Sequence, residues 1–292
     1  MLDVEGECAR LEARLAEGAV LRDFLLARYL RRGLRALQPL RGRAVRLRGL
    51  REDLAAAREF AAGDPAWTAE AERLAAECRA LEARLEAELA RWDRYDPHDA
   101  VLSIEGEEHG RRAVAAYYLD FAERLGRRMR PLDGAVGALG RDTYAITGGA
   151  DDDPGVWASL KADNGVHLVR AQGEADKEGG AGEDLAVRVT VHPDAGTGAS
   201  LPESPADWRI DTLCTRDPRE PPSFFITHLP TGASYYGTGA DLQEAKGNAL
   251  RQIAARALAA GVPEDEPAHR FLHPGVAPVR VHAVRACPAS GT

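Results

Sequence analysis

The sequence contains few cysteines and no long apolar run, and both absences limit what the protein can be. Only four of its 292 residues are cysteine, and they lie far apart, at positions 8, 78, 214 and 287. This spacing argues against a disulfide framework, and no histidine stands at metal-ligand spacing from any of them, so we expect no metal site. No window reaches the ~18 consecutive apolar residues that a spanning helix requires, so we expect no membrane partner.

Lysine is also scarce, since 35 of the 38 basic residues are arginine. Acidic residues number 46, and the resulting net charge of -8 excludes a protein that binds nucleic acid through bulk positive charge. Any RNA contact must be local. The first 20 residues have no basic segment followed by an apolar core, so we expect a cytoplasmic protein. The length predicts about two domains, and the composition is typical of globular proteins.

Residues 1–95 are predicted to form a helical domain of two or three antiparallel helices. Leucines, Cys78 and Trp92 recur at spacings of three or four between 74 and 92, as on one buried helix face. Asp64 and Pro65 have the residue types of an N-cap and a first helical position, so a helix is expected to begin there.

An arginine-rich segment lies within this domain. Residues 24–51 hold nine arginines and no acid. One interpretation is a basic face for RNA or an acidic protein partner, with Arg28, Arg31, Arg35 and Arg46 as candidate contacts. The other, which we favour, is a solvated helix face in an arginine-rich sequence.

Residues 96–203, together with 268–285, are predicted to form a central α+β domain. We expect a helix from about Glu107 to Met129 and strands at 100–104, 143–147, 156–160, 166–170 and 185–191. In the last strand, Leu185, Val187, Val189 and Val191 alternate with more polar neighbours. Val279–Val284 alternates too and is expected to return to this sheet. One helix among several strands indicates an α+β arrangement.

Residues 204–266 are predicted to form a small βββα domain. Strands are expected at 208–213, 224–228 and 233–236, followed by a helix to Ala259 for which Asp241 is a suitable N-cap. No general catalytic or cofactor motif is present anywhere in the chain, and we expect no cofactor.

Several short phrases between residues 96 and 250 occur in a particular order. They are 96–104 (DPHDAVLSI), 161–170 (KADNGVHLVR), 205–212 (PADWRIDT) and 226–232 (ITHLPTG), followed by Gln243, Lys246 and Ala249. In this order they resemble the core of the class I peptide chain release factors. The resemblance implies three parts: an N-terminal helical domain, a codon-reading α+β domain and a domain that reaches the peptidyl-transferase centre.

The chain departs from that family's pattern between the last two phrases. There the family carries a Gly-Gly-Gln loop whose glutamine positions the water that hydrolyses peptidyl-tRNA. Here residues 213–225 (LCTRDPREPPSFF) contain no glycine and no glutamine. Proline has no N–H to donate, so we expect hydrolysis by the family mechanism to be absent and name no catalytic residue. Thr215, Arg216, Asp217 and Arg219 form either an altered loop tip or the remnant of a deletion.

The codon-reading region departs as well. The resemblance places it around His167, Arg170, Gln172 and Gly173, where the family carries a Pro-x-Thr or Ser-Pro-Phe tripeptide. This chain instead has five acidic residues between 174 and 184, which phosphate would repel.

Three hypotheses follow. The first is a release-factor-like protein that binds the ribosome or ribosomal RNA without hydrolysing peptidyl-tRNA. The second is a hydrolase or termination factor that uses another group, such as Cys214 or His228. The third is an RNA- or protein-binding scaffold outside translation.

Overall fold

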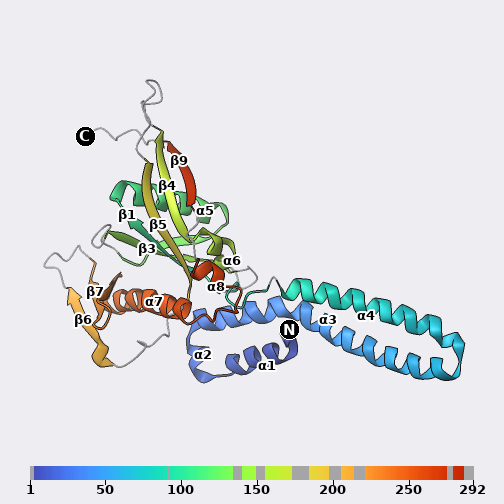
Figure 1. The fold of residues 1–292 in the computed structure, drawn as a ribbon. Coiled ribbons are helices and arrows are strands. Elements are labelled where there is room, and N and C mark those ends of the chain that lie inside the picture. The colour runs from blue at the N-terminus through green and yellow to red at the C-terminus, as the bar shows by residue number, and fades with distance from the viewer. Residues whose placement is uncertain are drawn as a thin grey trace. The chain divides into compact units, whose positions relative to one another are not determined.

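A computed structural model describes residues 3–90, 92–133, 140–148, 155–172, 184–196, 205–213, 221–274 and 279–285. The chain divides into two compact units, Met1–Arg94 and Tyr95–Thr292 (Figure 1). The division into three domains, with a further boundary near residue 203, remains a prediction. The α+β fold class with an N-terminal helical region is confirmed.

The first unit is helical. Its elements are α1 (Val4–Leu15), α2 (Gly18–Arg22), α3 (Phe24–Gly63), a 3₁₀ turn η1 (Pro65–Trp67) and α4 (Thr68–Leu89). The predicted helix start is confirmed, because the Asp64 side chain accepts a hydrogen bond from the Ala66 N–H at 2.9 Å. The turn at η1 brings α4 back along α3, and leucines at spacings of three or four fill the core between α1, α3 and α4.

The second unit contains a six-stranded sheet. Its strands are β1 (Ala100–Gly106), β2 (Arg128–Pro131), β3 (Arg141–Thr147), β4 (Gly165–Gln172), β5 (Asp184–Pro193) and β9 (Val279–Arg285), in the order β2-β3-β1-β5-β4-β9. All neighbours are antiparallel except β4 and β9. The return of β9 to this sheet is therefore confirmed.

One face of the six-stranded sheet packs against α5 (Glu108–Arg124). Leu102 and Ile104 of β1 and Val187 and Val189 of β5 point to this side, where they meet Tyr118 in the largest buried cluster. Alternation along each strand sends the residues between them to the opposite face. That opposite face carries polar side chains such as Ser103 and Thr190, and also the apolar Val101 and Ala145, which cluster with Ala255.

Two sequence predictions in this unit were wrong. The helix expected to reach Met129 ends at Arg124, because Gly126 adopts a positive φ of 63° and the chain then enters β2. The strand expected at 156–160 is the helix α6 (Val156–Leu160). A five-residue apolar run fits either element, and here it buries Val156, Trp157 and Leu160 on one side of a helical turn.

A small module, residues 205–260, completes the second unit. It consists of η4 (Pro205–Asp207), the three-stranded sheet β6 (Trp208–Leu213), β7 (Ser223–His228) and β8 (Ala233–Thr238), and α7 (Leu242–Ala260). A short helix, α8 (His269–Leu272), follows. Asp241 caps α7 by accepting a hydrogen bond from the Glu244 N–H at 2.8 Å, as the sequence predicts.

Candidate functional site in the small module

The small module is held together by packing of α7 against β7 and β8. Ile226 and Tyr235 from the strands meet Ala249 and Ile253 from the helix in one buried cluster. Gly237 of β8 lies directly against α7, where a side chain would overlap backbone atoms of the helix. The glycine therefore permits a close strand–helix contact.

Two polar side chains of α7 tie the helix to β8. Asn248 donates to the Thr238 carbonyl at 2.6 Å, and Gln252 donates to the Tyr236 carbonyl at 2.7 Å. Neither residue is among the sites predicted from the sequence. Their spacing of four, which places them on one helix face, is the pattern that could have revealed them.

Two of the phrases that carry the family resemblance, 205–212 and 226–232, meet at one end of the module. Trp208 pairs with His228 in the β6–β7 register, and their rings lie 4.6 Å apart. His228 Nδ1 is 2.7 Å from Thr231 Oγ1 in the turn that follows, and Gly232 there adopts a φ of 69°. These contacts give His228 a structural role in the turn.

The opposite end of the β6–β7 pair carries the altered loop. Leu213 pairs with Ser223, so residues 214–222 connect two strand ends that are held side by side. Buried Ser223 accepts a hydrogen bond of 2.6 Å from the Tyr236 hydroxyl at the base of this loop. The candidate tip residues Thr215, Arg216, Asp217 and Arg219 lie outside the described residues, as does Cys214.

His228 lies at the other end of β7 from Ser223. It stands five residues along β7 from Ser223, or about 17 Å at the rise of an antiparallel strand. A group at Ser223 is therefore outside hydrogen-bond reach of His228, and general acid–base chemistry requires that reach.

The predicted codon-reading residues lie on or just beyond β4. His167 is buried, with Nε2 2.9 Å from the Asp163 carbonyl, so it supports the fold. Arg170 is exposed and donates two hydrogen bonds of 3.0 Å to Asp184 across the β4–β5 pair, and this contact lowers the pKa of that carboxyl. Gln172 pairs with Arg285 of β9. Gly173 lies outside the described residues.

The candidate RNA-binding arginines lie on α3. Arg28 is buried, with its guanidinium 5.9 Å from the centre of the Phe24 ring, and Arg46 pairs with Glu77 at 2.6 Å. Arg31 and Arg35 are exposed.

Further arginines of the same segment are also paired with acids of α1 and α4. The pairs are Arg41–Glu12, Arg43–Glu88, Arg48–Glu5 and Arg51–Glu82. With Arg46, five of the nine arginines in residues 24–51 are neutralised from neighbouring helices. The segment therefore presents less free positive charge than its sequence suggests.

Among the described residues, no cluster of histidine, cysteine and carboxylate side chains is arranged to hold a metal ion. In the same part of the chain, no helix is long and apolar enough to cross a membrane.

A helical unit followed by a six-stranded sheet and a small three-stranded module defines an α+β protein with a helical N-terminal region. Residues 4–180 match the PCRF domain. Peptide chain release factor 1 of Acidothermus cellulolyticus is 36% identical over 281 residues, covering 90% of this chain and 76% of the relative. Peptide chain release factor 1 of Rhodococcus jostii is 32% identical over 279 residues, covering 88% of this chain and 76% of the relative. The chain belongs to the class I peptide chain release factor family, whose members serve translation termination.

The chain is also similar to a solved structure, RF2 of Thermus thermophilus. The two are 18% identical with a TM-score of 0.49, and the similarity covers 97% of this chain and 86% of that one.

Proposed function

We propose that this protein is a cytoplasmic translation factor that binds the ribosome without hydrolysing peptidyl-tRNA by the family mechanism. One observation carries the proposal. The strands β6, β7 and β8 and the helix α7 form a complete module around a loop, residues 214–222, that contains neither glycine nor glutamine. A scaffold kept without its reactive loop supports a binding role.

The chemistry of the loop supports the same conclusion. Pro218, Pro221 and Pro222 lack the N–H that would stabilise an oxyanion or orient a water, and each fixes φ near -65°. No glutamine side chain is present to position the attacking water. His228, whose ring contacts Trp208 and Thr231, lies about 17 Å from the strand end at Ser223, and we do not propose it as the replacement.

We further propose that the protein does not recognise stop codons through the segment that the family resemblance assigns to codon reading. The segment that follows β4 in the sequence has acids at 174, 176, 178, 183 and 184, and Arg170 of β4 donates hydrogen bonds to Asp184. An acidic segment would be repelled by messenger RNA phosphates.

The direct test is co-sedimentation with 70S ribosomes and separated subunits across a salt series, with a peptide-release assay on the same preparation. We expect binding that weakens steeply as salt rises, with no release above background. Release above background would overturn the loss of hydrolysis. Absence of binding at low salt would overturn the ribosomal role.

A variant in the helical unit tests whether the exposed arginines of α3 carry the ribosome binding. Charge reversal of the two exposed arginines, Arg31→Glu with Arg35→Glu, leaves in place the arginines of α3 that pair with acids of α1 and α4. We propose that the second unit carries ribosome binding. The double variant should therefore still sediment with ribosomes. Complete loss of binding would assign the interaction to the α3 face instead.

A further inference from the structure

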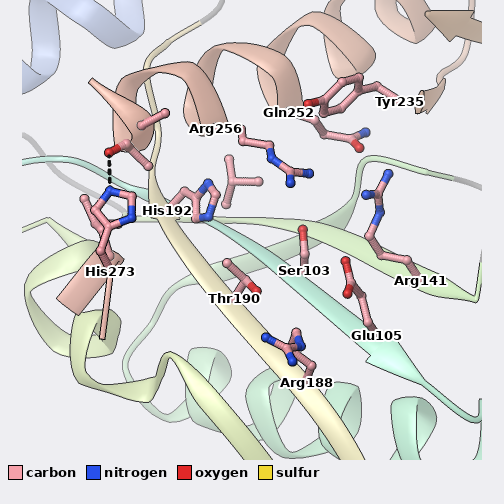
Figure 2. A pocket seen from close by; sticks show the side chains of 14 residues that line it. Ser103, Glu105, Arg141, Arg188, Thr190, His192, Tyr235, Gln252, Arg256 and His273 are labelled. Carbon is pink, nitrogen blue, oxygen red and sulfur yellow. Dashed lines mark hydrogen bonds between the residues drawn. The ribbon is translucent and has the colours of Figure 1, made fainter. Parts of the chain in front are cut away.

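The polar face of the six-stranded sheet borders a cavity of about 460 Å³ beneath α7 (Figure 2). Ser103 and Glu105 of β1 and Arg188, Thr190 and His192 of β5 alternate with the apolar residues that face α5. Their side chains form the floor of the cavity, and α7 forms its roof. The volume lies within the range of small-molecule sites.

Three arginines surround this cavity from different elements. Arg188 comes from β5 and Arg256 from α7, on opposite sides of the space, and Arg141 comes from β3 (Figure 2). Neither Arg188 nor Arg256 makes a hydrogen bond or ion pair with a described residue. Arg141 donates one hydrogen bond of 2.9 Å to the Ser234 carbonyl, while its buried Nε has no acceptor within the described part of the chain.

The cavity contains too little negative charge to balance these groups. Glu105 is the acid among the lining residues, and it pairs in strand register with Arg141 on one side and Arg188 on the other. It forms no ion pair with either of them. Burial, Arg256 and His273 lower the pKa of His192 to about 4, so that imidazole is neutral at pH 7.

A bound anion would balance the excess positive charge of the three arginines. Guanidinium groups bind phosphate through paired N–H donors, and the hydroxyls of Ser103 and Thr190 add donors on the floor. The lining also includes Val101, Ala259 and Leu272, whose apolar side chains suit the carbon part of a ligand. The cavity therefore combines a cationic region with an apolar wall.

We propose that this cavity binds a small phosphorylated molecule of about nucleotide size. The phosphate would lie among Arg141, Arg188 and Arg256, and the organic part against Val101 and Leu272. A polynucleotide is less suited to the site, because the sheet and α7 cover it from two sides. The proposal does not depend on the proposed ribosomal role.

The test is calorimetric titration of the purified full chain with pyrophosphate, ATP and GTP at low salt. We expect Arg188→Gln and Arg256→Gln each to weaken binding about tenfold or more, because each removes a charge-assisted contact. Glu105→Gln should tighten binding several-fold, because it removes the opposing charge. Arg79 is exposed on α4, outside the cavity, so Arg79→Gln makes the same charge change and should leave the affinity for the phosphate compounds unchanged.

The opposite directions expected for Glu105→Gln and Arg188→Gln distinguish a charge effect from general damage to the fold. Failure of all three phosphate compounds to bind wild-type protein would overturn the proposal. So would equal weakening by Arg79→Gln, or competition by citrate as strong as that by pyrophosphate. Binding of a short RNA but of no small phosphate, with dependence on Arg188 and Arg256, would overturn it in favour of an RNA surface.

Discussion

Removing the Arg251 side chain tests how α7 is fixed to the central sheet. Arg251 Nε lies 2.9 Å from Asp194 Oδ2, and Nη2 contacts the same oxygen. The side chains are 2% and 0% exposed. Asp194 directly follows β5, where its Oδ1 also accepts a hydrogen bond of 3.1 Å from the Gly196 N–H. The pair therefore joins the small module to the six-stranded sheet through a buried contact.

The expected cost of Arg251→Ala follows from this burial. Removing one partner of a buried pair leaves the other charge without compensation, which costs about 3–5 kcal/mol of unfolding free energy. For a unit of this size, each kcal/mol lowers the melting temperature by about 2–4 °C. The variant should therefore melt about 6–20 °C below wild type.

The measurement is urea denaturation with calorimetry, applied to Arg251→Ala, Asp194→Asn and the double variant. The double variant should be less destabilised than the sum of the single ones, because the two residues share one interaction. Arg209→Ala is the matched control, since Arg209 pairs with Asp211 on the exposed surface, and its loss should change stability by less than about 0.5 kcal/mol. A loss below about 1 kcal/mol for Arg251→Ala would refute the reasoning.

Three further predictions concern single groups. Burial raises the pKa of Asp133 from 3.8 to about 6, so the native state binds more protons than the unfolded state between pH 4 and 6. The contribution of Asp133 to the free energy of unfolding therefore falls as pH rises through that range. Asp133→Asn should abolish this contribution in denaturation curves measured across the range. The pKa of His192 is lowered by burial first and Arg256 second, so Arg256→Gln should raise it in an NMR titration while leaving it below 6.5. Gly237→Ala should lower the melting temperature, because the added methyl overlaps the backbone of α7.

Much of the fold was predictable because hydrophobic periodicity and caps are local properties. The alternation in residues 185–191 predicted β5, and Asp241 predicted the start of α7. Where local signals were weak, prediction failed: the short run 156–160 fits two kinds of element, and only its packing made it helical. The paired state of Arg46 was not predictable either, because its partner Glu77 lies on another helix.

The sequence by itself determined the family, most of the helices and strands, and the absence of glycine and glutamine from residues 213–225. These are properties of residue identity and spacing along the chain. Only the tertiary structure decided that the polar side of β5 is covered by α7, so that Arg188 and Arg256 share one cavity. Alternation shows that a strand has a polar face, but what covers that face depends on contacts between residues distant in the chain.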